Sequence, residues 1–216
     1  MSTVHTDRWR AVAVLEKKSI YREIEIVILD DNRLVIEILR QVLKELGANR
    51  LASFTNPYDA LECFSARRID IAFIDLIMPH MDGFEITQMV RNANDIVNRM
   101  MPIVMVTGHA DLRTVKRAIN FGVDEIIGKP FAPKALQQRL DSVLFYPRRY
   151  IRTQSGYFGP DRRRMISSGY AGDCRRKLDT SIDVGTPSFG MDSQLSHEPD
   201  IFDLEDHDIT FSRNIS

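Results

Sequence analysis

From about residue 24 the chain alternates between short apolar runs and segments with helical spacing, and this alternation constrains the fold more than any other feature. The strand-like runs are EIVILD at 25–30, RLASF at 50–54, IDIAFID at 69–75, PIVMVT at 102–107 and DEIIG at 124–128. Regular alternation of this kind is typical of a parallel β-sheet with crossover helices. The sequence therefore predicts an α/β fold with five strands and five helices.

Capping residues and apolar spacing place the helices between these strands. Asn32 precedes an amphipathic segment that ends at Gly47, and Asn56 with Pro57 has the pattern of an N-cap and first helical residue. The expected helices cover residues 33–46, 57–65, 84–98, 112–121 and 133–144.

Composition places the chain among ordinary soluble proteins. Its 216 residues are enough for one well-cored domain, and 44% are hydrophobic and 27% charged. The longest apolar run is well short of the roughly 20 residues that cross a bilayer, so we expect a cytoplasmic protein without a transmembrane segment. Cys63 and Cys174 offer neither a disulfide framework nor metal-ligand spacing.

Five polar residues stand where the apolar runs end: Asp30, Asp31, Asp75, Thr107 and Lys129. In a parallel sheet these positions meet at the carboxyl edge, where open α/β sheets bind their ligands. Three carboxylates, a hydroxyl and an ammonium in one crevice suit a metal ion and a phosphoryl group. Taken alone, an acidic pair after a strand is more often a turn or a helix cap, so the hypothesis depends on the joint pattern.

Four short motifs carry a resemblance to a known family: LDD at 29–31, DLIMPHMDG at 75–83, VTG at 106–108 and GKPF at 128–131. With them, residues 24–146 resemble the CheY-like receiver domain of two-component response regulators. The resemblance implies a doubly wound five-stranded parallel sheet in the flavodoxin-like order 2-1-3-4-5, with helices on both faces.

The same resemblance implies a phosphorelay function rather than an enzyme, apart from self-catalysed aspartyl phosphorylation and dephosphorylation. Its donor would be a histidine kinase or a phosphotransfer protein, and a downstream protein partner would read the result. The implied roles are phosphoacceptor for Asp75, Mg²⁺ ligands for Asp30, Asp31, Asp75 and the backbone carbonyl of Ile77, and phosphoryl binding for Thr107 and Lys129.

One position departs from the family pattern. Most receivers carry a Tyr or Phe three residues before the lysine, and here that position is Ile126. A β-branched side chain cannot exchange an exposed hydroxyl for a buried ring, so we expect output through another surface. A receiver-fold scaffold that works without phosphorylation is the alternative that this departure favours.

The two ends differ in character from the middle. Residues 1–23 form an N-terminal extension that we expect to be partly helical, around Trp9–Leu15. Residues 147–216 show no sustained period and are predicted to be mostly disordered. Residues 148–177 contain nine Lys or Arg and two Asp, a net charge of +7. Residues 178–216 contain nine acidic residues and one Arg, a net charge of −8. Such blocks indicate docking or self-contact; nucleic-acid binding through 148–177 is the less favoured alternative, and a homodimer is left open.

Overall fold

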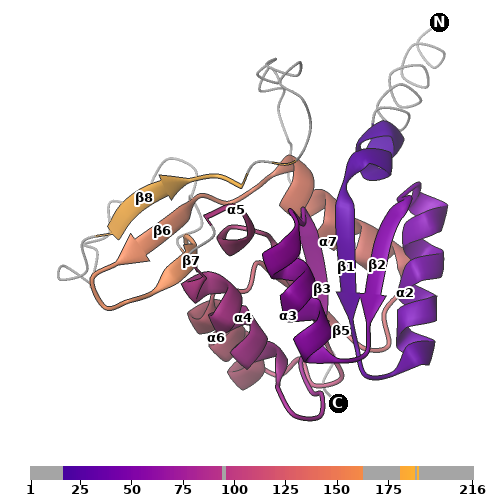
Figure 1. Ribbon diagram of the computed structural model, residues 1–216, viewed down its shortest axis with the longest axis horizontal. Helices are drawn as coiled ribbons and strands as arrows, with labels where there is room; N and C mark the ends of the chain where they lie inside the picture. The colour runs from indigo at the N-terminus through magenta and orange to yellow at the C-terminus, as the bar shows by residue number, and fades with distance from the viewer. Residues whose placement is uncertain (1–16, 94–95, 163–180, 188, 190–216) are drawn as a thin grey trace, which may run out of the picture.

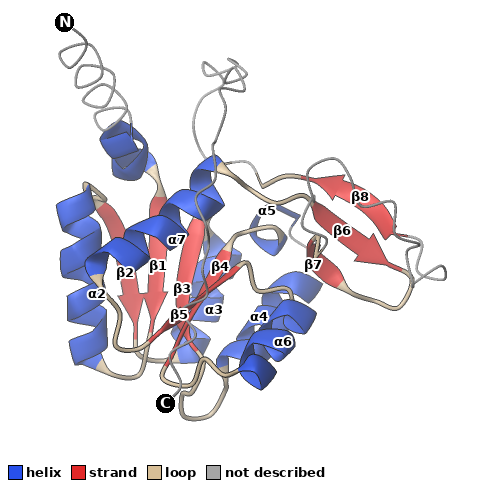
Figure 2. Cartoon of the chain, turned by 180° about the vertical axis from the view of Figure 1, so that it is seen from behind, coloured by secondary structure: helices blue, strands red, loops and turns tan. Residues whose placement is uncertain are grey.

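In the computed structural model, the structure describes residues 17–93, 96–162, 181–187 and 189. Five parallel strands form one sheet in the order β2-β1-β3-β4-β5, which confirms the predicted fold class and strand order (Figures 1 and 2). Its elements are β1 (Glu25–Leu29), α2 (Arg33–Leu46), β2 (Arg50–Phe54), α3 (Pro57–Ala66), β3 (Ile71–Asp75), α4 (Gly83–Asn92), α5 (Ile96–Arg99), β4 (Ile103–Thr107), α6 (Leu112–Phe121), β5 (Glu125–Gly128) and α7 (Pro133–Phe145).

Helices cover both faces of this sheet (Figures 1 and 2). Successive residues of a strand point to opposite faces, so Ile26 and Ile28 pack with α2 and α7, whereas Val27 and Leu29 pack with α3 and α4. Helices therefore bury both faces of the sheet, which explains why β1, β3 and β4 are continuous apolar runs rather than alternating apolar and polar residues.

The helix caps are those that the sequence predicts. The Asn32 and Asn56 side chains accept hydrogen bonds from backbone N–H groups of the first turns of α2 and α3. Gly47 follows α2 with φ 111°, a left-handed conformation that suits glycine.

The prediction of a single helix over 84–98 is wrong, because this segment forms two helices, α4 and α5. Ala93 has ψ 149°, which is not helical, so α4 ends there and α5 is a separate single turn. The break lets the chain turn back so that the carbonyl oxygens of Arg99 and Met101 both accept hydrogen bonds from the Arg91 guanidinium.

Packing continues beyond the predicted receiver segment at its N-terminal side. Residues 17–23 are helical, and the buried Tyr21 ring belongs to the core between α2 and α7. Lys17 forms an ion pair of 2.8 Å with Asp141 in α7, whose carboxylate also accepts from the Tyr21 hydroxyl. The expected helix around Trp9–Leu15 lies outside the described residues.

Three further strands follow the receiver segment: β6 (Tyr150–Thr153), β7 (Phe158–Pro160) and β8 (Ser181–Gly185). They pair antiparallel in the order β7-β6-β8, and we call them the small sheet (Figure 1). The prediction of a mostly disordered tail does not hold for these residues. The segments YIRT, FGP and SIDVG mix apolar residues with polar residues, Gly and Pro, so they do not stand out as apolar runs. Most of the basic and acidic blocks lies outside the described residues.

None of the helices in the described part of the chain combines the length and the apolar character needed to span a bilayer.

Candidate phosphoacceptor site

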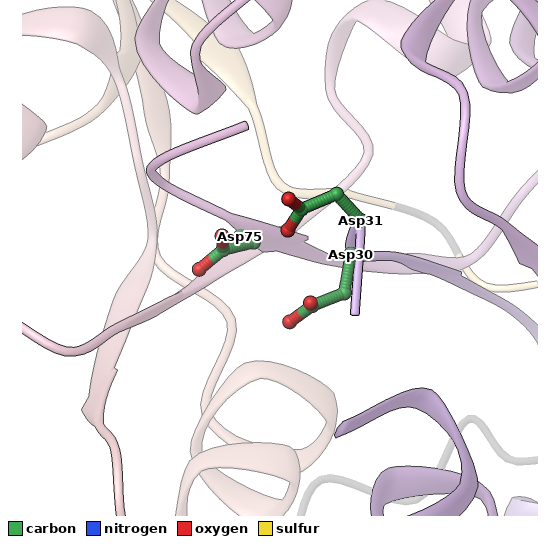
Figure 3. Close-up of side chains that lie close together, drawn as sticks. All are labelled: Asp30, Asp31 and Asp75. Carbon is green, nitrogen blue, oxygen red and sulfur yellow. The ribbon is translucent and has the colours of Figure 1, made fainter. Parts of the chain in front are cut away.

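Three carboxylates gather where the central strands end. Asp30 and Asp31 directly follow β1, and Asp75 is the last residue of β3, the neighbouring strand. One oxygen from each carboxylate lies within 4.8 Å of the others (Figure 3). Asp30 and Asp75 are buried, and Asp31 is exposed. The parallel register of β1 and β3 thus creates the acidic cluster that the sequence predicts.

The fourth charge is an ammonium that joins two of these acids. Lys129 Nζ donates to Asp30 Oδ2 at 2.6 Å and to Asp75 Oδ1 at 2.8 Å. The peptide bond between Lys129 and Pro130 is cis, and the Lys129 N–H donates to the Thr107 carbonyl at 2.6 Å. The lysine therefore follows β5 directly and reaches across the edge of the sheet to the acids.

Burial and charge act against each other in this cluster. Burial raises the pKa of the Asp75 carboxyl, the Lys129 ammonium partly offsets this rise, and the neighbouring charges of Asp30 and Asp31 add to it. For Lys129, burial alone would lower the pKa, but hydrogen bonds and charges from Asp30 and Asp75 outweigh burial and raise it. The lysine is thus held as a cation beside Asp75.

Thr107 ends β4, the strand next to β3, and its side chain is fully buried. Its Oγ1 accepts a hydrogen bond from the His109 N–H at 3.1 Å. The hydroxyl is therefore engaged with the first residues of the loop that leads to α6. All five strand-end side chains lie at one edge of the sheet.

Two further positions were singled out by sequence. Ile77 lies two residues after Asp75, and its side chain is 61% exposed; its role as a carbonyl ligand stays a prediction. Ile126 is half-buried and packs beside Phe121 against the cluster that α4 and α6 share. An aliphatic side chain therefore fills the space next to β4 at this position.

Gly83 is a site residue that the sequence analysis missed. A Cβ atom built on Gly83 would lie 2.5 Å from the Asp75 carbonyl oxygen and 3.1 Å from Leu76 Cα. Only glycine lets α4 begin this close to the end of β3. The DG pair after the MPH loop is the signal that could have indicated it, since Asp82 caps α4 through a capping box with Glu85.

The donor set fits a hard divalent cation. Three clustered carboxylates with one ammonium leave an excess of negative charge, and oxygen ligands of this kind are those that Mg²⁺ prefers. The buried pair Asp30 and Asp75 shares one lysine, whereas Asp31 forms no ion pair within the described residues. A cation among the three acids would relieve their repulsion.

The fold and this acidic edge define a CheY-like α/β signalling domain, and the comparisons with known proteins agree. Residues 26–141 match the response regulator receiver domain family. This match covers more than half of the chain, so the protein belongs to that family, whose members transduce signals in two-component systems.

Individual relatives share the receiver part. The chain is 31% identical over 146 residues to the "Probable transcriptional regulator ycf27" of Cyanidium caldarium, covering 68% of this chain and 55% of that protein. It is 35% identical over 127 residues to the "Heme response regulator HssR" of Staphylococcus aureus, covering 58% and 51%. The chain thus spans about half the length of the curated relatives that it matches.

Solved structures agree on the fold. The receiver domain of a signal transduction histidine kinase from Syntrophus aciditrophicus is 29% identical, with a TM-score of 0.51 over 56% of this chain and 90% of that one. The chemotaxis protein CheY4 of Vibrio cholerae, at 24% identity and a TM-score of 0.52, shares the fold over 56% and 98%.

Proposed function

We propose that this protein is a phosphorelay response regulator that accepts a phosphoryl group on Asp75. The donor is a histidine kinase or a phosphotransfer protein, and the phosphorylated form changes the protein's contacts with a downstream partner. One observation carries the proposal: the Lys129 ammonium bridges Asp30 and Asp75, with Asp31 completing a cluster of acids within 4.8 Å.

In the transfer, an Asp75 carboxylate oxygen forms a bond to phosphorus while the bond from phosphorus to the donor's histidine nitrogen breaks, and the imidazole keeps the electron pair. Lys129 already lies 2.8 Å from one oxygen of Asp75, so it is placed to bind an oxygen of the incoming group. Thr107, from the next strand, supplies a hydroxyl to a second phosphoryl oxygen.

Asp30, Asp31, Asp75 and the backbone carbonyl of Ile77 would hold a Mg²⁺ ion, which when bound neutralises charge on the phosphoryl oxygens. Asp30 also accepts a hydrogen bond from the Asn32 N–H at 2.9 Å, which fixes the orientation of its carboxylate beside β3. We place the protein in the cytoplasm, where such donors act.

The absent aromatic at Ile126 favours one second candidate, a receiver-fold scaffold that acts without phosphorylation. Beryllofluoride, which mimics a phosphoryl group on aspartate, discriminates between the two. Binding of beryllofluoride that requires Mg²⁺, measured by calorimetry, supports the phosphoacceptor, whereas its absence supports the scaffold. Nucleic-acid binding is less favoured, because Arg148 donates to the Asp124 carbonyl and Arg149 pairs with Asp183.

The decisive variant is Asp75→Asn, which keeps the side-chain size but removes the nucleophilic carboxylate. Incubation with acetyl phosphate and Mg²⁺ should label the wild type, and the label should be lost in this variant. Asp59→Asn, the same change on the exposed first turn of α3, is the matched control and should label like the wild type. Labelling that persists in Asp75→Asn would place the acceptor elsewhere.

A further inference from the structure

The small sheet is attached to the receiver part through a buried guanidinium. Arg91 lies at the end of α4 with its side chain 3% exposed, and all five of its N–H donors have partners. Its acceptors are the carbonyl oxygens of Gly122 at 3.0 Å, Arg99 at 2.8 Å and Met101 at 2.9 Å, Asp124 Oδ2 at 3.0 Å and the Tyr150 hydroxyl at 3.1 Å.

Tyr150 brings the first strand of the small sheet into this network. Its side chain is fully buried, and its hydroxyl donates to the Asp124 carboxylate at 3.0 Å while it accepts from Arg91. Arg91 and Asp124 form a buried ion pair, so separating either from Tyr150 would leave polar groups buried without partners. The polar groups therefore favour a single position of β6 against α4.

A second attachment is made by backbone atoms. Gly122 ends α6 with φ 84°, and a Cβ on it would lie 2.8 Å from the Phe158 carbonyl oxygen. A Cβ on Gly159 would lie 2.7 Å from Gly122 Cα. The end of α6 and strand β7 thus touch without an intervening side chain, so a displacement of one presses directly on the other.

The same helix begins beside the phosphoacceptor site. Thr107 is bonded to the His109 N–H, and Asp111, four residues after Thr107, caps α6. Ten residues at 1.5 Å each make α6 about 15 Å long, so it runs from the acidic edge to the opposite edge of the sheet. Ala118 is the one buried residue of the helix. On the same face, α3 has three buried residues and α4 has six, so α6 is, of the three, the helix that the fewest buried side chains anchor.

We infer that the small sheet reads the phosphorylation state of Asp75 through α6. The inference rests on the proposed function. When Thr107 turns its hydroxyl to the phosphoryl group, it gives up the bond to the His109 N–H, and the loop before α6 is released. The shift of α6 then reaches β7 at Gly122 and β6 through Arg91 and Tyr150.

This route does not need an aromatic residue on β5. Ile126 packs against the cluster that α6 shares with α4, so it fills space rather than switching between two positions. Stacking of Phe84 on Phe121, with centroids 5.0 Å apart, couples the two helices near the end of α6 that faces the small sheet. The end of α6 that contacts β7 is thus also packed against α4.

Hydrogen exchange of the full-length chain, measured by mass spectrometry with Mg²⁺ and with or without beryllofluoride, tests this inference. Peptides from residues 107–111 report the site, and peptides from 150–160 report the small sheet. We expect beryllofluoride to change exchange in both, by about two-fold or more in rate, because residues 107–111 lead into α6 and the small sheet contacts the other end of that helix.

Tyr150→Phe isolates the attachment, since it removes the hydroxyl bonded to Arg91 and Asp124 and keeps the ring. The variant should bind beryllofluoride and respond at 107–111, with a response at 150–160 below half that of the wild type. Tyr157→Phe is the matched control, because that hydroxyl donates to the Pro160 carbonyl within the same hairpin. It should respond like the wild type.

The outcomes separate the inference from the proposed function. A response at 107–111 with none at 150–160 in the wild type would overturn the inference and leave the phosphoacceptor role intact. A full response at 150–160 in Tyr150→Phe would overturn the step in which the Tyr150 hydroxyl carries the shift to β6. No beryllofluoride binding in the wild type would refute both together.

Discussion

Replacing Asp31 by asparagine should stabilise the protein when Mg²⁺ is absent. Asp31 is the exposed member of the acidic cluster, and its carboxylate forms no ion pair within the described residues. Its neighbours Asp30 and Asp75 share the single Lys129 cation. Asp30, Asp75 and Lys129 together carry one net negative charge. Folding brings the Asp31 carboxylate close to this charge, and the two repel each other.

The size of the effect follows from the separation of the carboxylate oxygens, which is within 4.8 Å. Two unit charges at this distance repel by about 0.9 kcal/mol in bulk water and by about 3.5 kcal/mol at an effective dielectric constant of about 20. Because Asp31 is exposed, the lower figure applies more nearly. We expect Asp31→Asn to raise the free energy of unfolding by about 1 kcal/mol in the presence of a chelator.

Magnesium should reverse the order of stability. A ligand at 100 times its dissociation constant stabilises a folded protein by about 2.7 kcal/mol, and Asp31→Asn should lose most of this gain because it lacks one of the ligands. Urea unfolding followed by circular dichroism, with EDTA and with Mg²⁺, measures both effects. Asp59→Asn, on an exposed helical turn outside the site, should unfold like the wild type in EDTA and should keep the full stabilisation by Mg²⁺.

Two results would refute this reasoning. A loss of stability in Asp31→Asn without metal would mean that the carboxylate makes a favourable contact in the folded state. An undiminished gain on adding Mg²⁺ would mean that the ion binds somewhere other than the acidic cluster.

Three further changes probe the framework around the site. Gly83→Ala should cost about 1–3 kcal/mol in urea unfolding, because its Cβ meets backbone atoms, whereas Gly108→Ala, whose Cβ has no atom within 4 Å, should cost little; equal costs would contradict the close approach. Arg91→Met should cost about 3–5 kcal/mol by leaving the Asp124 carboxylate buried without its cation, and adding Asp124→Asn should recover part of the loss; a fully additive double variant would argue against the pair. The pKa of Asp111 is lowered by its hydrogen bonds with Thr114, so its contribution is present above the unfolded-state pKa of about 3.9 and lost as pH falls through the folded-state value. The wild type should therefore exceed Asp111→Ala in thermal stability at neutral pH and approach it in acid, and a pH-independent difference would contradict this role.

The acidic edge could be predicted because the acidic residues directly follow, in the sequence, the strands that position them. Asp30 and Asp75 each stand where an apolar run ends, and the parallel arrangement of β1 and β3 follows from strand and helix alternation. No knowledge of side-chain packing is needed to bring them together. Gly83 was missed for the converse reason, since its role depends on a backbone approach of 2.5 Å that only the packed structure reveals.

The small sheet could not be predicted because its strands have no recognisable local sequence pattern. Strand β8 pairs with β6 across the intervening segment, and β7 contains Gly159 and Pro160, which are poor strand formers. The structure supplies the missing reason. Arg91 is buried, so its guanidinium needs an acid and further acceptors, and Asp124 and Tyr150 provide them only once the chain is packed.

The polar attachment of the small sheet also explains why its position is specific. An apolar contact at Tyr150 would bury similar area but would tolerate sliding of a three-stranded sheet that has few core residues of its own. Here any slip would separate the hydroxyl from Asp124 and Arg91 and leave a buried ion pair short of a hydrogen-bond partner. The network fixes β6 in one position on the receiver fold, and a fixed position is what an element needs if small movements of α6 are to reach it.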